Sequence, residues 1–220
     1  MTHPAEPHDG PELAHHFDDP QQQHDTALLG MWAFLATEVM FFGGLFAAYT
    51  VYRSLHFAGF AAASRRLDVP LGAINTAILL TSSLTMALAV RAAQLKQRRP
   101  LVLLLAATAI LGAAFLGVKA FEWRHDFHEG LIPGPNFTFD SADYRDAQMF
   151  FVIYFLMTGL HAIHLIIGIA IVALYAIWCA RAPRVGSRET QVEVVGLYWH
   201  FVDLIWVFLY PLLYLIQVHR

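Results

Sequence analysis

The sequence predicts an all-α integral membrane protein, a bundle of five transmembrane helices. Its 220 residues have a mean hydropathy of +0.50, and 57% of them are hydrophobic whereas only 14% are charged, a balance far from that of soluble domains. Five apolar stretches each hold the roughly 20 residues that a helix needs to cross a hydrocarbon core of about 30 Å. These stretches cover about 27–52, 70–93, 101–123, 147–179 and 192–218.

Capping and turn residues separate the five stretches. Asp25 and Thr26 are candidate N-caps of the first helix, and Pro70 opens the second after a polar segment. A short basic hinge ending at Pro100 precedes the third, and the longest loop, 124–146, contains Gly-Pro turn signals. The fourth stretch is longer than a bilayer requires, so we expect it to tilt or to project beyond the membrane.

Residues 1–26 form a polar tail ahead of the first stretch. They contain five histidines and six acidic residues but no Lys or Arg, so they lack the basic start and apolar run of a signal peptide. This composition predicts a disordered tail, with adventitious metal binding by its histidines as the alternative.

Orientation follows from the density of basic residues in short loops. Basic residues crowd the segments after the second and fourth helices: Arg91, Lys96, Arg98, Arg99, Arg181, Arg184 and Arg188. The opposite loops are longer and mix their basic residues with acids. We therefore expect the N-terminus and its tail in the cytoplasm and the C-terminus outside.

Several classes of function are excluded by composition. A net charge of −3 without a basic patch argues against nucleic-acid binding. The single cysteine, Cys179, rules out an intrachain disulfide and any cysteine-based metal cluster. No nucleophile-turn or H-E-x-x-H pattern predicts a hydrolytic site.

Ionisable groups inside apolar spans are costly, so they are the candidate functional residues. Glu38 lies near the middle of the first span, His161 and His164 share a face of the fourth, and His200 and Asp203 share a face of the fifth. Asn75, Lys119 and Glu122 lie nearer the span ends. Three membrane-embedded histidines are too few for a haem–copper centre, so we expect no metal here. Two interpretations of these residues remain open: a proton relay, or a set of interhelical hydrogen bonds that satisfies buried polar groups.

Five segments, in order, resemble a known family. The run YWHFVDLIWVFLYPLLY at 198–214 is similar to the closing helix of subunit III of haem–copper respiratory oxidases, with Tyr-Trp-His-Phe-x-Asp as its most specific part. The runs GMWAFLATEVMFF at 30–42, LGAINTAILLTSS at 71–83, KAFEW at 119–123 and TGLHAIHLIIG at 158–168 agree with it. The chain looks like the shorter, five-helix bacterial form.

The resemblance implies a subunit that holds no haem or copper itself. In this family the subunit packs on subunit I, beside subunit II and small subunits, supports proton uptake, protects the active site during turnover and binds phospholipid. The resemblance leaves open whether the oxidase joins a larger respiratory supercomplex. The expected location is the bacterial cytoplasmic membrane. Glu38 matches the family's buried carboxylate, and we expect it to be largely neutral and hydrogen-bonded to a histidine such as His161 or His200.

The lipid site departs from the family pattern. Trp178 stands where longer members carry an arginine for a lipid phosphate, and Arg181 lies about one turn beyond it. Arg181, Trp178 and Trp199 are the candidate lipid-headgroup contacts. Because Glu38 occupies a position where quinol-oxidase relatives can lack a carboxylate, we expect a cytochrome c oxidase. A quinol oxidase, an accessory protein of nitric oxide reductase and a stand-alone proton or solute transporter are the alternatives.

Overall fold

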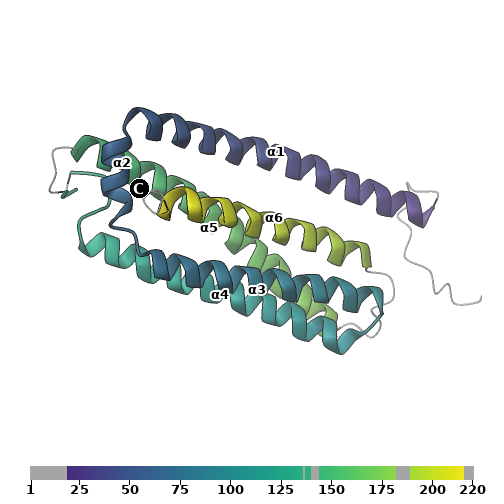
Figure 1. The fold of residues 1–220 in the computed structure, drawn as a ribbon. Helices are drawn as coiled ribbons and strands as arrows, with labels where there is room; N and C mark the ends of the chain where they lie inside the picture. Colours follow the sequence, from purple (N-terminus) through teal and green to yellow (C-terminus); the bar gives the residue numbers. More distant parts are fainter. Residues whose placement is uncertain (1–18, 136, 140–143, 182–188, 216–220) are drawn as a thin grey trace, which may run out of the picture.

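The computed structural model describes residues 19–135, 137–139, 144–181 and 189–215, and within them it is all-helical with no strand (Figure 1). Five helices are long and apolar enough to cross a membrane, which confirms the predicted fold class. The elements are α1 (Pro20–Leu55), α2 (Phe57–Ser64), α3 (Val69–Gln94), α4 (Arg98–His128), α5 (Tyr144–Arg181) and α6 (Glu189–Tyr214).

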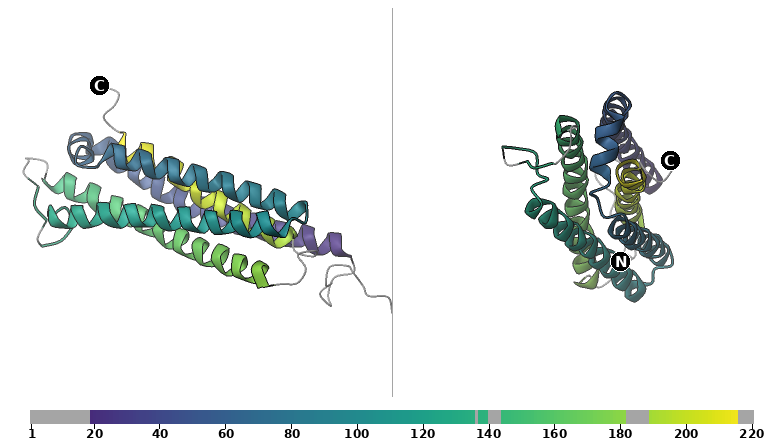
Figure 2. Two further views of the ribbon diagram at one scale, coloured as in Figure 1. Left: turned by 90° about the horizontal axis from the view of Figure 1, so that it is seen from below. Right: turned by 60° about the vertical axis from the view of Figure 1, so that its left-hand side comes forward.

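Helix α6 lies at the centre of the bundle and α1 at its edge. In the most apolar window of α6, 56% of the residues are buried, against 11% in α1. Helices α3 and α4 run side by side, α5 crosses behind α6, and α1 packs mainly on α6 (Figures 1 and 2). One long face of α1 is therefore left uncovered by the other described residues.

Successive spans run in opposite directions, which brings distant segments together at each end of the bundle. At one end, Nε2 of His24 lies 3.1 Å from Oε2 of Glu193, and the amide of Gln94 donates to the other oxygen of Glu193 at 3.1 Å. At the opposite end, the hydroxyl of Tyr49 donates to the carbonyl of Leu212 at 2.6 Å. The first turn of α1 and the ends of α3 and α5 thus share one end with the starts of α4 and α6.

The helix starts differ from those predicted. Helix α1 begins at Pro20, and its N-cap is Asp19, whose carboxylate accepts from the backbone N–H of Gln21 at 3.2 Å. The predicted caps Asp25 and Thr26 lie inside the helix instead. A proline at the first position and an acidic cap favour a helix start at this point. The residues that follow are helical but polar, so the hydropathy of the sequence does not detect them. Residues 20–26 are therefore helical, and residues 1–18 lie outside the described chain.

Between the first two spans, where we predicted a polar segment, the structure contains a short helix of mostly apolar residues. Helix α2 carries Phe60, a fully buried side chain whose ring lies 5.7 Å from that of Tyr49 and 5.5 Å from that of Phe150. These aromatic contacts hold α2 against the ends of α1 and α5. At the C-terminus, α6 ends at Tyr214, and the end predicted near 218 lies outside the described residues.

Candidate functional site

Glu38 on α1 meets a histidine of α5. Its Oε2 lies 3.1 Å from Nε2 of His164, and both side chains are 18% exposed. The expectation that a histidine pairs with Glu38 is confirmed, but the partner is His164 and not His161 or His200. Residues 161 and 164 share a broad helix face, and only the rotation of α5 in the bundle decides which of them points at α1.

The second ring nitrogen of His164 constrains the protons of this pair. Nδ1 lies 2.8 Å from the carbonyl oxygen of Leu160, and because a carbonyl can only accept, Nδ1 carries a hydrogen. Nε2 then faces Glu38 either as an acceptor from a protonated carboxyl or as a donor from an imidazolium to a carboxylate. A hydrogen bond between Nε2 and Glu38 therefore needs one proton, carried either by the carboxyl or by the imidazolium.

An apolar groove leads along α5 and α6 to this pair. One hollow, of about 430 Å³, includes His164, Phe34 and Tyr198 in its lining, and a second, of about 660 Å³, includes Trp178 and Gln191. Both hollows are also lined by the same three aliphatic residues, Ile171, Val194 and Val195. Because they share these residues, we treat the two hollows as one groove between α1, α5 and α6, hereafter the apolar groove, with His164 of the Glu38–His164 pair at one end.

The other histidines of the predicted network lie apart from Glu38. His161 is almost fully buried, and its ring lies 5.7 Å from that of Phe115 and 5.3 Å from that of Trp206. Neither ring nitrogen of His161 has a hydrogen-bond partner among the described residues. Nδ1 of His200 lies 2.7 Å from the hydroxyl of Ser83 on α3. His161 and His200 therefore belong to separate helix contacts.

Two further polar side chains of the predicted set, Asn75 and Asp203, are buried in the bundle. Asn75 on α3 is fully buried, and neither its amide nitrogen nor its oxygen is hydrogen-bonded within the described chain. Asp203 on α6 is 3% exposed and neighbours Ser83, but the same part of the structure offers no hydrogen bond to either of its oxygens. Both groups face the interior of the bundle.

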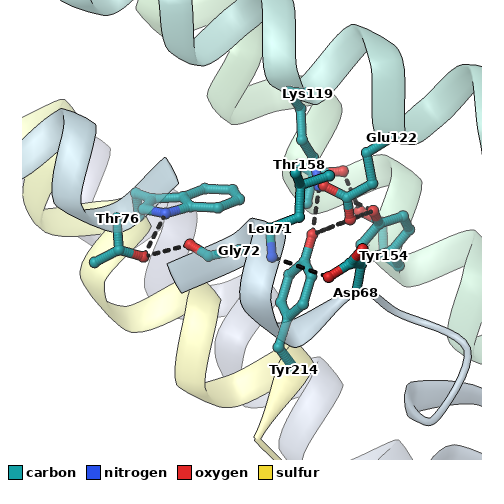
Figure 3. Close-up of polar contacts among 10 residues, drawn as sticks. Asp68, Leu71, Gly72, Thr76, Lys119, Glu122, Tyr154, Thr158 and Tyr214 are labelled. Carbon is teal, nitrogen blue, oxygen red and sulfur yellow. Dashed lines mark hydrogen bonds and ion pairs between the residues drawn. The ribbon is translucent and has the colours of Figure 1, made fainter. Parts of the chain in front are cut away.

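Glu122 belongs to a four-residue cluster that the sequence did not predict as a unit (Figure 3). The ammonium of Lys119 lies 3.1 Å from the carboxylate of Glu122, and it also donates to the hydroxyls of Tyr154 at 2.9 Å and Tyr214 at 2.6 Å. Both tyrosine hydroxyls donate in turn to Oε1 of Glu122. The spacing of Lys119 and Glu122 signals the ion pair. Nothing local signals the two tyrosines, which come from α5 and α6.

Trp199, predicted as a lipid-headgroup contact, lies inside the bundle. It is fully buried, and its indole N–H donates to the hydroxyl of Ser82 at 3.0 Å. Its ring occupies the space left by two glycines, since a Cβ at Gly112 would approach it to 2.7 Å and one at Gly168 to 3.3 Å. Trp199 therefore packs α4, α5 and α6 together and does not face lipid, which corrects the prediction.

The two remaining lipid candidates lie at the last turns of α5. Trp178 is 39% exposed and lines the apolar groove, and Arg181 is the exposed last residue of the helix. Their positions leave the lipid prediction open. Among the described residues, no group of three or more His, Cys, Asp or Glu side chains is placed to hold a metal ion.

Comparison with known proteins identifies the family. The family described as cytochrome c oxidase subunit III matches residues 15–218. Subunit 3 of a cytochrome bo(3) ubiquinol oxidase from Pseudomonas aeruginosa is 30% identical, over 94% of this chain and 93% of the relative. Cytochrome c oxidase subunit 3 from Thermostichus vulcanus is 32% identical, over 90% of this chain and 92% of the relative. The corresponding subunit from Bacillus subtilis is 33% identical, over 85% of this chain and 84% of the relative. The chain therefore belongs to the subunit III family of haem–copper oxidases.

Proposed function

We propose that this chain is the non-catalytic subunit III of a bacterial cytochrome c oxidase, which packs on subunit I, binds phospholipid and supports proton uptake. The observation that carries this proposal is the Glu38–His164 pair at the end of the apolar groove. The haem and copper of the complex would reside on partner subunits. Similar relatives include both cytochrome c and quinol oxidase subunits, so the choice of cytochrome c rests on the presence of Glu38.

The role in proton uptake follows from the proton that the Glu38–His164 hydrogen bond needs. A pair that exchanges between neutral and ionic forms holds a proton at little cost in a medium where an isolated charge would be expensive. Each side chain is 18% exposed and His164 lines the groove, so the pair is not sealed in the core. The structure thus supports a proton-holding group on the membrane-facing side of this subunit.

The lipid role follows from the chemistry of the groove. Its walls are aliphatic and aromatic along the hollows that meet at Ile171, Val194 and Val195, which suits an acyl chain. At its other end Trp178 and the side-chain amide of Gln191 provide a polar rim, with Arg181 on the next turn of α5. We propose that a phospholipid lies here with its headgroup at this rim.

The proposed orientation places this rim on the cytoplasmic side. Arg91, Arg98, Arg99 and Arg181 lie at the end of the bundle where α1 begins, consistent with the positive-inside rule for a chain in the bacterial cytoplasmic membrane.

Co-purification from the native membrane tests the assignment. An affinity tag on this chain should recover a haem-bearing subunit I, seen in optical haem spectra, together with a copper-binding subunit II. Recovery of an oxidase without the copper site would move the assignment to a quinol oxidase. Transport of protons or solutes by the purified chain alone in liposomes, with no co-purifying haem protein, would overturn the subunit role.

Turnover of the purified complex tests the role of the pair. Glu38→Gln keeps the size of the side chain but removes its ionisable carboxyl group, so we expect normal assembly and initial rate with faster loss of activity during sustained turnover. Glu193→Gln is the matched control, because Glu193 also lies 3.1 Å from a histidine, at the far end of α1. Equal durability of both variants and the wild type would remove the proposed role.

A further inference from the structure

A separate hollow lies between the first turn of α4 and the last turn of α5, hereafter the arginine hollow. It has a volume of about 470 Å³ and is lined by Arg98, Arg99, Val102, Leu103 and Ala180. None of these residues lines the apolar groove. Two cationic side chains thus face the same space as two aliphatic ones, at one end of the membrane-spanning bundle.

Arg98 is fixed at the rim of this hollow by the end of α5. Its Nε donates to the carbonyl of Cys179 at 3.0 Å, and its Nη2 donates to the carbonyl of Ala180. These bonds satisfy carbonyls that the end of a helix leaves without partners. They also hold the guanidinium in one place, so a ligand does not have to order this long side chain when it binds.

Among the described residues, no carboxylate balances the positive charge of the arginine hollow. Within the described ranges, neither Arg98 nor Arg99 forms a salt bridge with a carboxylate. Arg181 at the end of α5 adds a third cation at the same end of the bundle. Neighbouring cations repel one another, and an anion bound between them relieves this repulsion.

The aliphatic wall indicates which anion fits. Leu103 is 70% exposed and Val102 is partly buried, and both lie one turn further into the span than the arginines. A soluble anion would gain nothing from this wall. A lipid places a phosphate at the membrane surface and an acyl chain directly below it, which matches the order of arginines and aliphatic residues along α4.

We infer that the arginine hollow binds an acidic phospholipid of the bilayer, with its phosphate between Arg98 and Arg99 and an acyl chain along Val102 and Leu103. This site is independent of the apolar groove and does not depend on the role proposed for the Glu38–His164 pair. Its ligand would bridge the start of α4 and the end of α5 on the outer surface of the bundle.

The test uses the purified oxidase complex in nanodiscs of phosphatidylcholine with increasing fractions of phosphatidylglycerol. Binding is followed by the immobilised fraction of spin-labelled phosphatidylglycerol. Arg99→Gln should weaken it about fivefold, because one basic residue near a membrane surface contributes about 1 kcal/mol towards an acidic lipid. Arg91→Gln, a basic residue of the same end outside the hollow, is the matched control and should change little. Arg99 makes none of the bonds that Arg98 gives to α5, so the variant leaves the helix end intact.

Two further arms separate a lipid from other anions. Leu103→Ser should also weaken phosphatidylglycerol binding, and its side chain is too exposed for the change to disturb the core. A large excess of inorganic phosphate should not displace the lipid label. Unchanged binding by Arg99→Gln, an equal loss in Arg91→Gln, or full displacement by phosphate would each overturn the inference.

Discussion

Lys119 and Glu122 form an ion pair inside α4 whose side chains are only 2% and 4% exposed, with 3.1 Å between the ammonium nitrogen and the carboxylate. The pair survives burial because hydroxyls of Tyr154 and Tyr214 bond both of its members (Figure 3). The ammonium also lies over the rings of these tyrosines and of Trp206, at 4.8–5.3 Å from the ring centroids. One cluster thus joins three helices at the end of the bundle where α6 terminates.

Removing one charge of this pair should destabilise the subunit strongly. Lys119→Met leaves a buried carboxylate without its cation, and breaking a buried pair in this way costs about 3–5 kcal/mol. The measurement is the temperature at which the subunit dissociates from the detergent-solubilised complex. The double variant Lys119→Met, Glu122→Leu removes both charges and should recover most of the loss. A double variant as unstable as the single one would contradict this account.

The hydroxyl of Tyr214 should contribute a smaller, separate amount. Tyr214→Phe removes an acceptor from Lys119 and a donor to Glu122 in a buried site. We expect the folded subunit to lose about 1–3 kcal/mol of stability, seen as a lower dissociation temperature in the same assay. Tyr210→Phe is the control. Tyr210 is only partly buried and its hydroxyl bonds the carbonyl of Val69 at 3.3 Å, so its loss should be less. Equal losses of stability in the two variants would mean that the hydroxyl in the cluster contributes no more than an ordinary hydrogen bond.

Packing around Trp199 should not tolerate a methyl group at Gly112. A Cβ there would lie 2.7 Å from the indole ring and 3.0 Å from Ile169, and the buried ring has no room to move. Overpacking of this kind costs about 1–3 kcal/mol, so Gly112→Ala should lower the thermal stability of the complex. Gly117→Ala in the same helix has nothing within 4 Å of its new Cβ and should be neutral or slightly stabilising. The reverse order of the two variants would show that the ring adapts.

Filling the apolar groove should exclude the phospholipid that we propose lies in it. Ile171 lines both hollows of the groove, so Ile171→Trp should lower the number of phospholipids that remain with the purified complex, as counted by native mass spectrometry. Ile163→Trp is the control, because Ile163 lies on the same helix, is 53% exposed and does not line the groove. The same lipid count in both variants would argue against an acyl chain in the groove.

Local sequence features account for much of the fold. Helices α3 and α5 begin and end within a few residues of the predicted stretches, because apolar length and capping residues act locally. The start of α1 was predicted too late, since polar residues after Pro20 are helical without being apolar. Hydropathy detects the part of a helix that lies in lipid, and a helix that continues into water carries no such signal.

Pairing between helices could be predicted only in part. The spacing of Lys119 and Glu122 indicates their contact, because both belong to one helix. The sequence could not show that His164, rather than His161, meets Glu38, or that Trp199 points inward. In a soluble helix the apolar stripe shows which face is buried. A membrane helix is apolar on all sides, so this guide is lost.

The sequence by itself determined that the chain is a five-helix membrane protein and which ionisable residues lie within its spans. Only the tertiary structure decided that Glu38 lies against His164, that two tyrosines enclose the Lys119–Glu122 pair, and that Trp199 packs the core. Helix periodicity fixes which side chains share a face. The rotation of each helix is set by close packing of small and large residues from other helices, and that packing exists only in the assembled bundle.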